Sequence, residues 1–294
     1  MNQHPYTYQP IVERAPLTFP DGKKLAFYVG LNIEHYEVSM SPFSENDPSP
    51  MVSGQRDYGT RVGIWRLLDL FDEVGLRASA ITNSDVCTRY PQIVQAGIER
   101  DWAWIAHGHT NSRFLGNMTV DEEQKYLQEM VDVFDGALPS RPKGWLGPAG
   151  SETFETPRLL GELGFTYLLD WVCDDQPFPL TNPGMISVPY SCELNDFGMW
   201  MTAIPGAVSL TGPDYERVVL DQFEVLLADA QKTGMVMALP IHTFVVGQPH
   251  LSKYFARILR EICSHDDVWL CTSDDIAEHY FATSGLVSAG NPTP

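Results

Sequence analysis

The sequence has little cysteine, little positive charge and no long apolar run. Its five cysteines form no Cys-x-x-Cys pair. An odd number of cysteines without such a motif is typical of reduced thiols rather than of a disulfide framework. No apolar run approaches the roughly 20 residues that a membrane helix needs, and the first residues lack the basic-then-apolar pattern of a signal peptide. We therefore expect a soluble, cytoplasmic protein.

The shortage of positive charge limits the choice of partner. Lys and Arg number 19 against 38 Asp and Glu, so the formal net charge is -19. Such a surface disfavours nucleic acid and anionic membrane as main partners. With 294 residues, 44% of them hydrophobic, and no visible linker, we expect a single catalytic domain over residues 1–294. Within it, residues 1–22 are predicted to form an irregular arm, and residues 284–294 a frayed tail.

Strand-like and helix-like patterns alternate along the chain. Short apolar runs are expected as strands at 24–31, 76–82, 102–106, 143–146, 165–169, 185–189, 235–241 and 268–271. Amphipathic or capped segments are expected as helices at 60–74, 90–100, 119–134, 156–163, 213–232, 251–263 and 273–280. Seven or eight strand–helix units predict a closed or nearly closed α/β barrel. The Pro- and Ser-rich loop at 40–59 is expected to be a lid or an oligomer contact.

The most informative stretch joins an apolar strand to two histidines. The run Trp102–Ala106 is followed at once by His107, Gly108 and His109, with Asn111 close behind. The residues after the strands of a barrel meet at one rim, where active sites assemble. Either histidine alone could be an ordinary turn residue, but the pair after an apolar strand favours a site.

Other predicted strands also end in polar groups. Asn32 and Glu34 follow the first strand, and His242 ends a late one. The remaining rim candidates are Trp145, Gly147, Pro148, Asp170, Trp171, Asp175, Glu193 and Asn195. Glu and His can bind a divalent metal whose water becomes a nucleophile, and a separate His can protonate a leaving nitrogen. Helix capping is the simpler explanation for some of the Asp and Asn residues, but not for Glu34, His107 and His242.

The order of these motifs resembles the polysaccharide deacetylase family, hydrolases that remove acetyl groups from N-acetylated sugars. The similar stretches are Asn32-Ile-Glu34, His107-Gly-His-Thr-Asn111, Gly144–Gly150, Asp170-Trp171 and Leu239-Pro-Ile-His242. The resemblance covers roughly residues 23–280 and implies a distorted (β/α)7-8 barrel, deacetylase-like. It places Glu34 and His107 at metal-ligand positions and Asn111 at the position of the family's second histidine ligand.

Three departures separate the sequence from that pattern. Asn32 stands where the family has its Asp base, Asn111 replaces a histidine ligand, and the Arg of the third motif has no counterpart. These departures resemble a branch that opens small cyclic amides, the bacterial purine-pathway allantoinase and the cyclic imide hydrolases. Tyr58–Trp65 and Ile241–Pro249 resemble that branch as well.

The resemblance implies opening of a cyclic amide or imide by water. Glu34 and His107, with Asn111 or His109 as a third group, would hold a divalent metal, zinc first, weakly or not at all. His242 would be the general acid, tuned by Asp170, Asp175 or Glu193. Asn32, Asn195 and the amides from Gly147 onward would donate to substrate oxygens. Trp145 and Trp171 would stack on the ring, unless they are core residues.

Two other functions stay open at this point. The first is a deacetylase acting on an N-acetyl sugar or a peptidoglycan fragment. The second is a catalytically inactive binding protein on the same fold, which the changes at Asn32 and Asn111 permit. The expected partners are a small cyclic amide and further copies of the chain, with a tetramer implied by the resemblance; neither nucleic acid nor membrane is expected.

Overall fold

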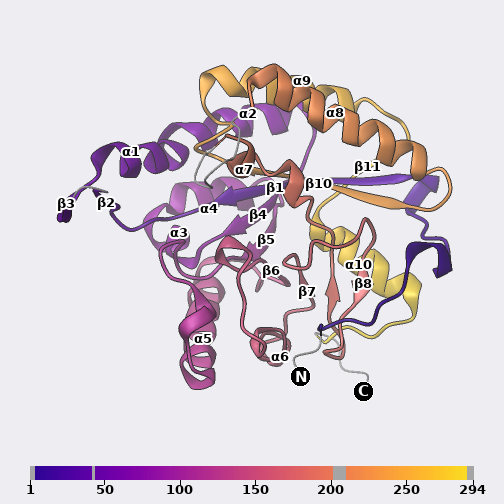
Figure 1. The fold of residues 1–294 in the computed structure, drawn as a ribbon, viewed down its shortest axis with the longest axis horizontal. Coiled ribbons are helices and arrows are strands. Elements are labelled where there is room, and N and C mark those ends of the chain that lie inside the picture. Colours follow the sequence, from indigo (N-terminus) through magenta and orange to yellow (C-terminus); the bar gives the residue numbers. More distant parts are fainter. Residues whose placement is uncertain (1–3, 42–43, 201–209, 290–294) are drawn as a thin grey trace.

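A curled sheet organises the molecule around its first strand. The computed structural model describes residues 4–41, 44–200 and 210–289. Strand β1 (Leu25–Ile33) pairs along its whole length with β10 (Met235–His242). On its other side it pairs with β11 (Val268–Leu270) at its start and with β4 (Ser79–Thr82) at its end. All four are parallel, so their carboxyl ends lie at one rim (Figure 1).

Shorter strands extend the sheet from β4. In spatial order they are β5 (Ala103–Ala106), β6 (Gly144–Trp145), β7 (Tyr167–Leu168), β9 (Ile186–Ser187) and β8 (Phe178–Pro179). Only β8 runs antiparallel to its neighbour in this sheet. The curled sheet with helices outside confirms the predicted distorted, deacetylase-like (β/α) barrel.

The two ends of the sheet meet without a continuous ladder. The backbone N–H of Val236 donates to the carbonyl oxygen of Asp175 at 2.8 Å, and that of Ala238 donates to Ser191 Oγ at 3.2 Å. Across the same seam the hydroxyl of Tyr28 donates to the carbonyl of Pro189 at 2.6 Å. Scattered polar contacts thus replace strand pairing here, which distorts the barrel.

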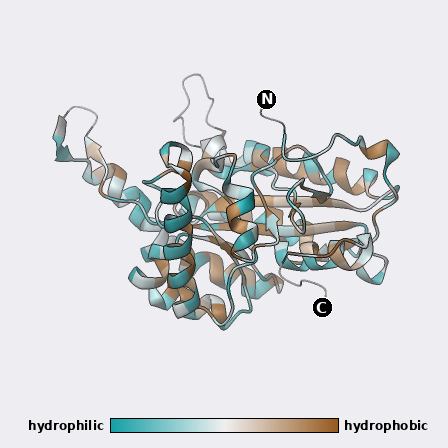
Figure 2. Ribbon diagram, turned by 90° about the horizontal axis from the view of Figure 1, so that it is seen from below, coloured by the Kyte–Doolittle hydropathy of each residue, from teal (hydrophilic) through white to brown (hydrophobic). Residues whose placement is uncertain are grey.

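Helices cover the outside of the sheet. They are α2 (Ile64–Val74), α3 (Ser84–Arg89), α4 (Pro91–Ile98), α5 (Val120–Ala137), α6 (Thr156–Glu162), α8 (Gly212–Asp229), α9 (Pro249–Cys263) and α10 (Ser273–Ser284), whereas the short α7 (Asp196–Trp200) lies at the rim against His242. Their apolar faces turn inward and their polar faces outward (Figure 2). None of the described helices has the length and apolar character that crossing a bilayer requires.

The helix caps show how local sequence sets these boundaries. A capping box of Thr119 and Glu122 opens α5. Thr272 and Asp275 form the corresponding box at the start of α10. The predicted helix at 60–74 has no cap at Thr60, because this residue lies inside a π-helical turn, Gly59–Gly63, that joins α1 (Pro50–Tyr58) and α2 without a break.

The expectation that residues 40–59 lack structure was wrong. The segment forms a small antiparallel hairpin, β2 (Met40–Ser41) and β3 (Ser44–Pro48), followed by helix α1 (Pro50–Tyr58). Pro50 stands at the first helical position, where its missing N–H costs nothing. The hairpin and α1 project from the body (Figures 1 and 2). The predicted loop is therefore an arm with regular structure, although residues 42–43 lie outside the described part.

The N-terminal arm is irregular, as predicted, but well anchored. It carries two short 3₁₀ turns, Ile11–Glu13 and Pro20–Gly22. Arg14 pairs with Asp174 at 2.5 Å, and Phe19 is buried. Residues 1–3 and 290–294, which belong to the predicted arm and tail, lie outside the described residues, and α10 continues to Ser284.

Close packing at the π-helical turn gives a stability test. A Cβ on Gly63 would overlap the carbonyl oxygen of Thr243, just after β10. Gly54 on α1 has open space around its Cα. We expect Gly63→Ala to lower the free energy of unfolding by about 1–3 kcal/mol through overpacking. Gly54→Ala should be neutral or stabilising by about 0.5–1 kcal/mol. Urea unfolding of both variants measures the difference, and equal stabilities would contradict this packing argument.

Candidate active site

A buried glutamate forms the centre of the rim. Glu34 follows β1 and exposes 2% of its side chain. Its Oε2 accepts a hydrogen bond from the Tyr36 hydroxyl at 2.6 Å, and its Oε1 accepts one from the side-chain amide of Asn111. Two imidazoles face the same Oε1, His107 Nε2 at 3.4 Å and His242 Nε2 at 3.5 Å. The predicted convergence of Glu34, His107 and His242 is therefore present in the structure.

The two imidazoles are oriented by different partners. His242 Nδ1 lies 2.7 Å from Asp196 Oδ1, and the Asp196 carboxylate also accepts from the His242 backbone N–H at 2.8 Å. His107 Nδ1 lies 2.6 Å from the carbonyl oxygen of Leu146. A carbonyl only accepts, so His107 carries a proton on Nδ1. Both rings consequently turn Nε2 toward Glu34.

Opposing charges shift the pKa values in this cluster. Burial alone would raise the pKa of Glu34, but the charge and hydrogen bonds of His242 and His107 hold it well below its ordinary value. Burial would lower the pKa of His242, but Glu34 and Asp196 raise it to about 10. Burial raises the pKa of Asp196, and His242 opposes that rise. At neutral pH the arrangement is an imidazolium held between two carboxyl groups.

A chain of amides fixes how Asn111 is turned. The backbone N–H of His35 donates to Asn83 Oδ1 at 2.8 Å, so Asn83 must direct its NH₂ group elsewhere. That group donates to Asn111 Oδ1 at 2.9 Å and to the carbonyl of His107. Asn111 therefore presents its own NH₂ group to Glu34. Its orientation is decided by a backbone donor that cannot be reversed.

The predicted three-ligand metal set does not fit this geometry. Asn111 turns N–H groups, not an oxygen, toward Glu34, and an amide N–H cannot ligate a cation. Among the residues that the structure describes, no group of three or more His, Cys, Asp or Glu side chains is arranged to hold a metal ion. Of the predicted ligands around this carboxylate, only Glu34 and His107 keep an atom that can bind a metal.

Asn32 lies beside the cluster, and its NH₂ group is bonded to other protein oxygens. Its NH₂ group donates to the carbonyl of Ile241 at 3.0 Å and to the Tyr190 hydroxyl at 3.2 Å. Asn32 is the register partner of His242 in the pairing of β1 with β10. It thus braces the two strands that carry Glu34 and His242, and its amide is already engaged by protein oxygens.

A second pair of carboxyl groups lies behind His107. Asp170 Oδ1 accepts from the Gly147 backbone N–H at 2.8 Å, which takes the Gly147 amide away from any substrate. Burial raises the pKa of Asp170 to about 7, and burial and Asp170 together raise that of Glu152 to about 8. Neither oxygen of Glu152, nor Asp170 Oδ2, has a hydrogen-bond partner among the described residues. Sequence analysis had not singled out Glu152.

Four predicted site residues lie apart from Glu34. His109 contacts the Ser84 hydroxyl at 2.6 Å and packs against Tyr126, and burial lowers its pKa. Glu193 is exposed and accepts from Gln222 on α8 at 2.5 Å. Asn195 Oδ1 accepts from the Phe197 N–H at 2.9 Å. Asp175 is exposed at the barrel seam. The partner that His242 needs is Asp196, not Glu193, Asp170 or Asp175.

The predicted aromatic and proline contacts are mainly structural. Trp145 is fully buried in the core. Trp171 packs against Tyr6 of the N-terminal arm, with ring centroids 5.6 Å apart. Pro148 is buried in a 3₁₀ turn, Pro148–Gly150, close to Gly108.

Sequence analysis assigned no role to Tyr36, Asn83 or Asp196. Asn83 could have been found, because it directly follows β4 at the same rim. Nothing in the sequence distinguishes Asp196 from the nearby Glu193 as the partner of the histidine. Tyr36 lies only two residues beyond Glu34, although its contact depends on how the chain leaves β1.

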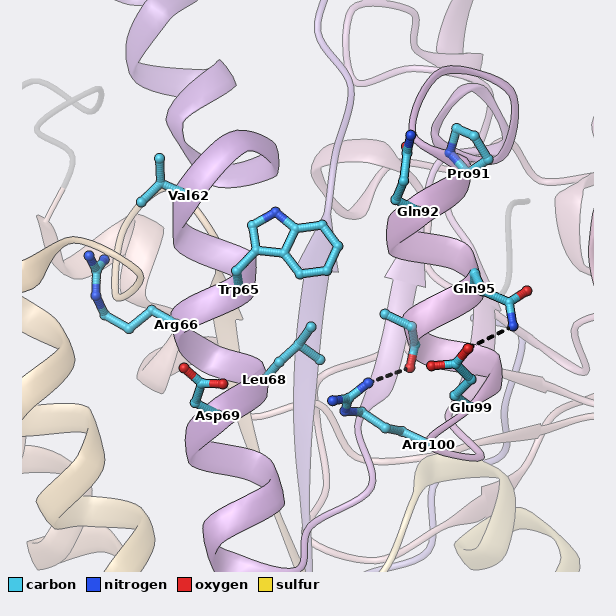
Figure 3. A pocket seen from close by; sticks show the side chains of 11 residues that line it. Val62, Trp65, Arg66, Leu68, Asp69, Pro91, Gln92, Gln95, Glu99 and Arg100 are labelled. Carbon is cyan, nitrogen blue, oxygen red and sulfur yellow. Dashed lines mark hydrogen bonds between the residues drawn. The ribbon is translucent and has the colours of Figure 1, made fainter.

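One surface groove in the described part of the chain lies away from this cluster. It has a volume of about 980 Å³ and lies between α2 and α4, on the outer helix layer (Figure 3). Trp65 projects into it from α2, and Arg100 donates to the carbonyl oxygen of Ala96 on α4 at 3.1 Å (Figure 3). It lacks the glutamate–imidazole cluster, so the rim of the barrel stays the candidate active site.

Known proteins resemble this chain in sequence and fold. The family described as polysaccharide deacetylase matches residues 44–168. A Schizosaccharomyces pombe protein whose name assigns it to the polysaccharide deacetylases is 24% identical over 77% of this chain and 75% of its own length. These matches confirm the family resemblance seen in the motifs.

Two solved structures share the fold over nearly the whole chain. One, from Pseudomonas aeruginosa PAO1, is named for polysaccharide deacetylase. It has a TM-score of 0.79 and 22% identity, covering 92% of this chain and 95% of its own. The other, PuuE allantoinase, has a TM-score of 0.77 and 24% identity, covering 90% and 93%. At such identities the likeness establishes the fold alone.

The raised pKa of Glu152 predicts a pH-dependent stability. In the folded protein the Glu152 carboxyl keeps its proton up to about pH 8, whereas in the unfolded chain it loses the proton near pH 4.5. The free energy of unfolding that Glu152 contributes therefore falls as the pH rises from about 4.5 to about 8. We therefore compare the melting temperature of Glu152→Gln with that of wild type at each pH. The variant's melting temperature minus that of wild type should be larger at pH 8 than at pH 5. The exposed Glu129 supplies a control, Glu129→Gln, with no such trend. A pH-independent difference for Glu152→Gln would contradict a protonated, buried Glu152.

Proposed function

We propose that this chain, which resembles the polysaccharide deacetylase family over residues 44–168, hydrolyses a carbon–nitrogen bond other than a peptide bond. The favoured substrate is a small cyclic amide or imide. The observation that supports this most is the contact of His242 Nε2 with Glu34 Oε1 at 3.5 Å, with Asp196 behind the ring. It is a paired acid and base at the centre of a rim of strand ends.

The proposed reaction uses both members of the pair. Glu34 accepts a proton from a water molecule as its oxygen attacks the substrate carbonyl. His242 donates its Nε2 proton to the leaving nitrogen as the carbon–nitrogen bond breaks. The proton on Glu34 then passes to His242 Nε2, which restores the starting state and leaves a carboxyl group and a free N–H on the product. Tyr36 and Asn111 hold Glu34 in place through both oxygens.

Asp196 has the role of positioning residue in this scheme. It accepts from His242 Nδ1, which leaves Nε2 as the only ring position that can face the substrate. Its charge also stabilises the imidazolium before the proton is transferred. His107 orients the other side of Glu34, and its own ring is held by Leu146.

Deacetylation of an N-acetyl sugar is the second candidate, and the names of the matched family and of the yeast relative favour it. The absence of an Asp at position 32 and the donor orientation of Asn111 favour the cyclic amide. A panel of succinimide, hydantoin, allantoin and an acetylated chitooligosaccharide separates the two. Tight binding to one of them without turnover would instead indicate an inactive binding protein.

The proposal includes a bound metal and an oligomer. A divalent metal, zinc first, could still bind Glu34 and His107 weakly, and elemental analysis of the purified protein tests this. Exposed Met51 and Val38 on the projecting arm are consistent with contact between copies, which light scattering tests. We retain a cytoplasmic homo-oligomer acting on a small molecule as the working proposal.

Removing the acid should abolish turnover without unfolding the protein. We expect His242→Gln to lower kcat by about 10²–10⁴-fold, the usual contribution of a positioned general acid. His265 follows α9 and contacts Phe223 on α8. We expect the control variant His265→Gln to keep full activity. Steady-state kinetics on the best substrate of the panel measures both, and unchanged turnover in His242→Gln would refute the assignment.

The pH profile tests Asp196 separately from His242. The imidazolium form is needed, and a pKa of about 10 predicts activity that falls only as pH rises through that value. Asp196→Asn removes one of the two negative charges that raise the pKa of His242. We therefore expect a lower kcat and an alkaline limb moved to lower pH. Glu193→Gln should leave that limb in place. An unmoved limb in Asp196→Asn would show that Asp196 has no influence on the acid.

A further inference from the structure

An arginine from the projecting arm sits in an aromatic cage beside the cluster. Arg56 lies in the last turn of α1. Its guanidinium carbon is 4.1 Å from the ring centroid of Tyr36, 4.6 Å from that of Phe244 and 4.9 Å from that of Phe197. The three rings come from the ends of β1 and β10 and from α7. Cation–π attraction to three faces holds the charge in a defined place.

This cation has an unsatisfied donor. Arg56 Nη1 is buried, yet it has no hydrogen-bond partner among the described residues. Buried donors in native proteins are nearly always paired, because an unpaired one costs about 1–3 kcal/mol. No carboxylate in the described ranges forms an ion pair with Arg56. A guanidinium N–H that is held in place and has no protein acceptor can bind an oxygen atom of a ligand.

Each ring of the cage also contacts the acid–base cluster. The Tyr36 hydroxyl donates to Glu34 Oε2 at 2.6 Å. The rings of Phe197 and Phe244 both lie 5.3 Å from the ring of His242. Arg56 is therefore separated from the reacting groups by a single layer of aromatic side chains. The guanidinium therefore lies close enough to the cluster for one bound molecule to contact both.

We propose that Arg56 is a substrate-positioning residue, which binds an acceptor oxygen of the substrate away from the carbon–nitrogen bond that breaks. This inference rests on the proposed function, and it narrows the substrate class. The ligand is a cyclic amide that carries a second acceptor, either a further ring carbonyl or a carboxylate. Arginine suits both, because its planar fork offers several N–H groups and keeps its charge. The chain has a net charge of -19, which repels an electron-rich ligand. A positive charge at Arg56 offsets this repulsion locally.

Matched pairs of probes distinguish the two sources of that oxygen. Succinimide and 2-pyrrolidinone differ by one ring carbonyl, and dihydroorotate and dihydrouracil differ by a carboxylate. We measure KM and kcat for each, and also binding by calorimetry, in wild type, Arg56→Lys and Arg56→Met. Arg61, which is exposed in the following π-helical turn, gives the matched control Arg61→Met.

We expect wild type to prefer the member of at least one pair that carries the extra oxygen. Arg56→Met should reduce that preference by about 10- to 100-fold, the range for a hydrogen bond to a charged group. Arg56→Lys should recover part of it, since it keeps the charge and loses the fork. Arg61→Met should behave as wild type. The loss should appear in KM and in the dissociation constant more than in kcat, with an unchanged melting temperature.

Several results would overturn the inference. One is equal preference in wild type and Arg56→Met. Another is a fall in melting temperature and kcat without a change in preference, which would make Arg56 only an anchor of α1. Failure of wild type to bind any probe would exclude this ligand class. Arg56-dependent binding without turnover would instead refute the proposed hydrolysis and leave the role of Arg56 intact.

Discussion

The structure depends on keeping one carboxylate ionised inside the barrel. Removing a charged carboxylate from water is expensive unless hydrogen bonds and opposite charge replace the solvent. Glu34 receives both: Tyr36 and Asn111 donate to its two oxygens, and His242 supplies the opposite charge. Because Asn111 and His242 come from distant parts of the chain, the complete cluster exists only when the strand ends are in register. Folding and assembly of the site are therefore one event.

The change from a metal ligand to an amide donor has a physical logic. An asparagine at position 111 can turn either end toward Glu34, but the chain of amides from His35 through Asn83 leaves it only the N–H end. The NH₂ group of Asn111 compensates part of the negative charge of Glu34. A bound cation at this position would have the same effect. The same chain ties the segments after β1, β4 and β5 together. An amide network thus performs the structural task of joining three strand ends.

The sequence predicted the convergence of Glu34, His107 and His242 because the ends of parallel strands must meet at one rim. It could not select Asp196 over Glu193. These residues are three positions apart, and the 3₁₀ turn at Cys192–Leu194 decides which carboxylate faces the barrel. The hairpin and α1 were missed for another reason. Their Pro- and Ser-rich composition is typical of loops, and helix α1 keeps no buried residue that would show an apolar stripe.

One peptide unit connects the acid–base cluster to the second pair of carboxyl groups. The carbonyl of Leu146 accepts from His107, and the N–H of Gly147, on the other side of the same planar peptide, donates to Asp170. Any change in the charge of Asp170 alters the polarity of that peptide and so the strength of the bond that orients His107. Since burial places the pKa of Asp170 near 7 and that of Glu152 near 8, this charge changes close to neutrality. The hydrogen bond that orients His107 and the one that Asp170 accepts are therefore joined through one peptide unit rather than through direct contact.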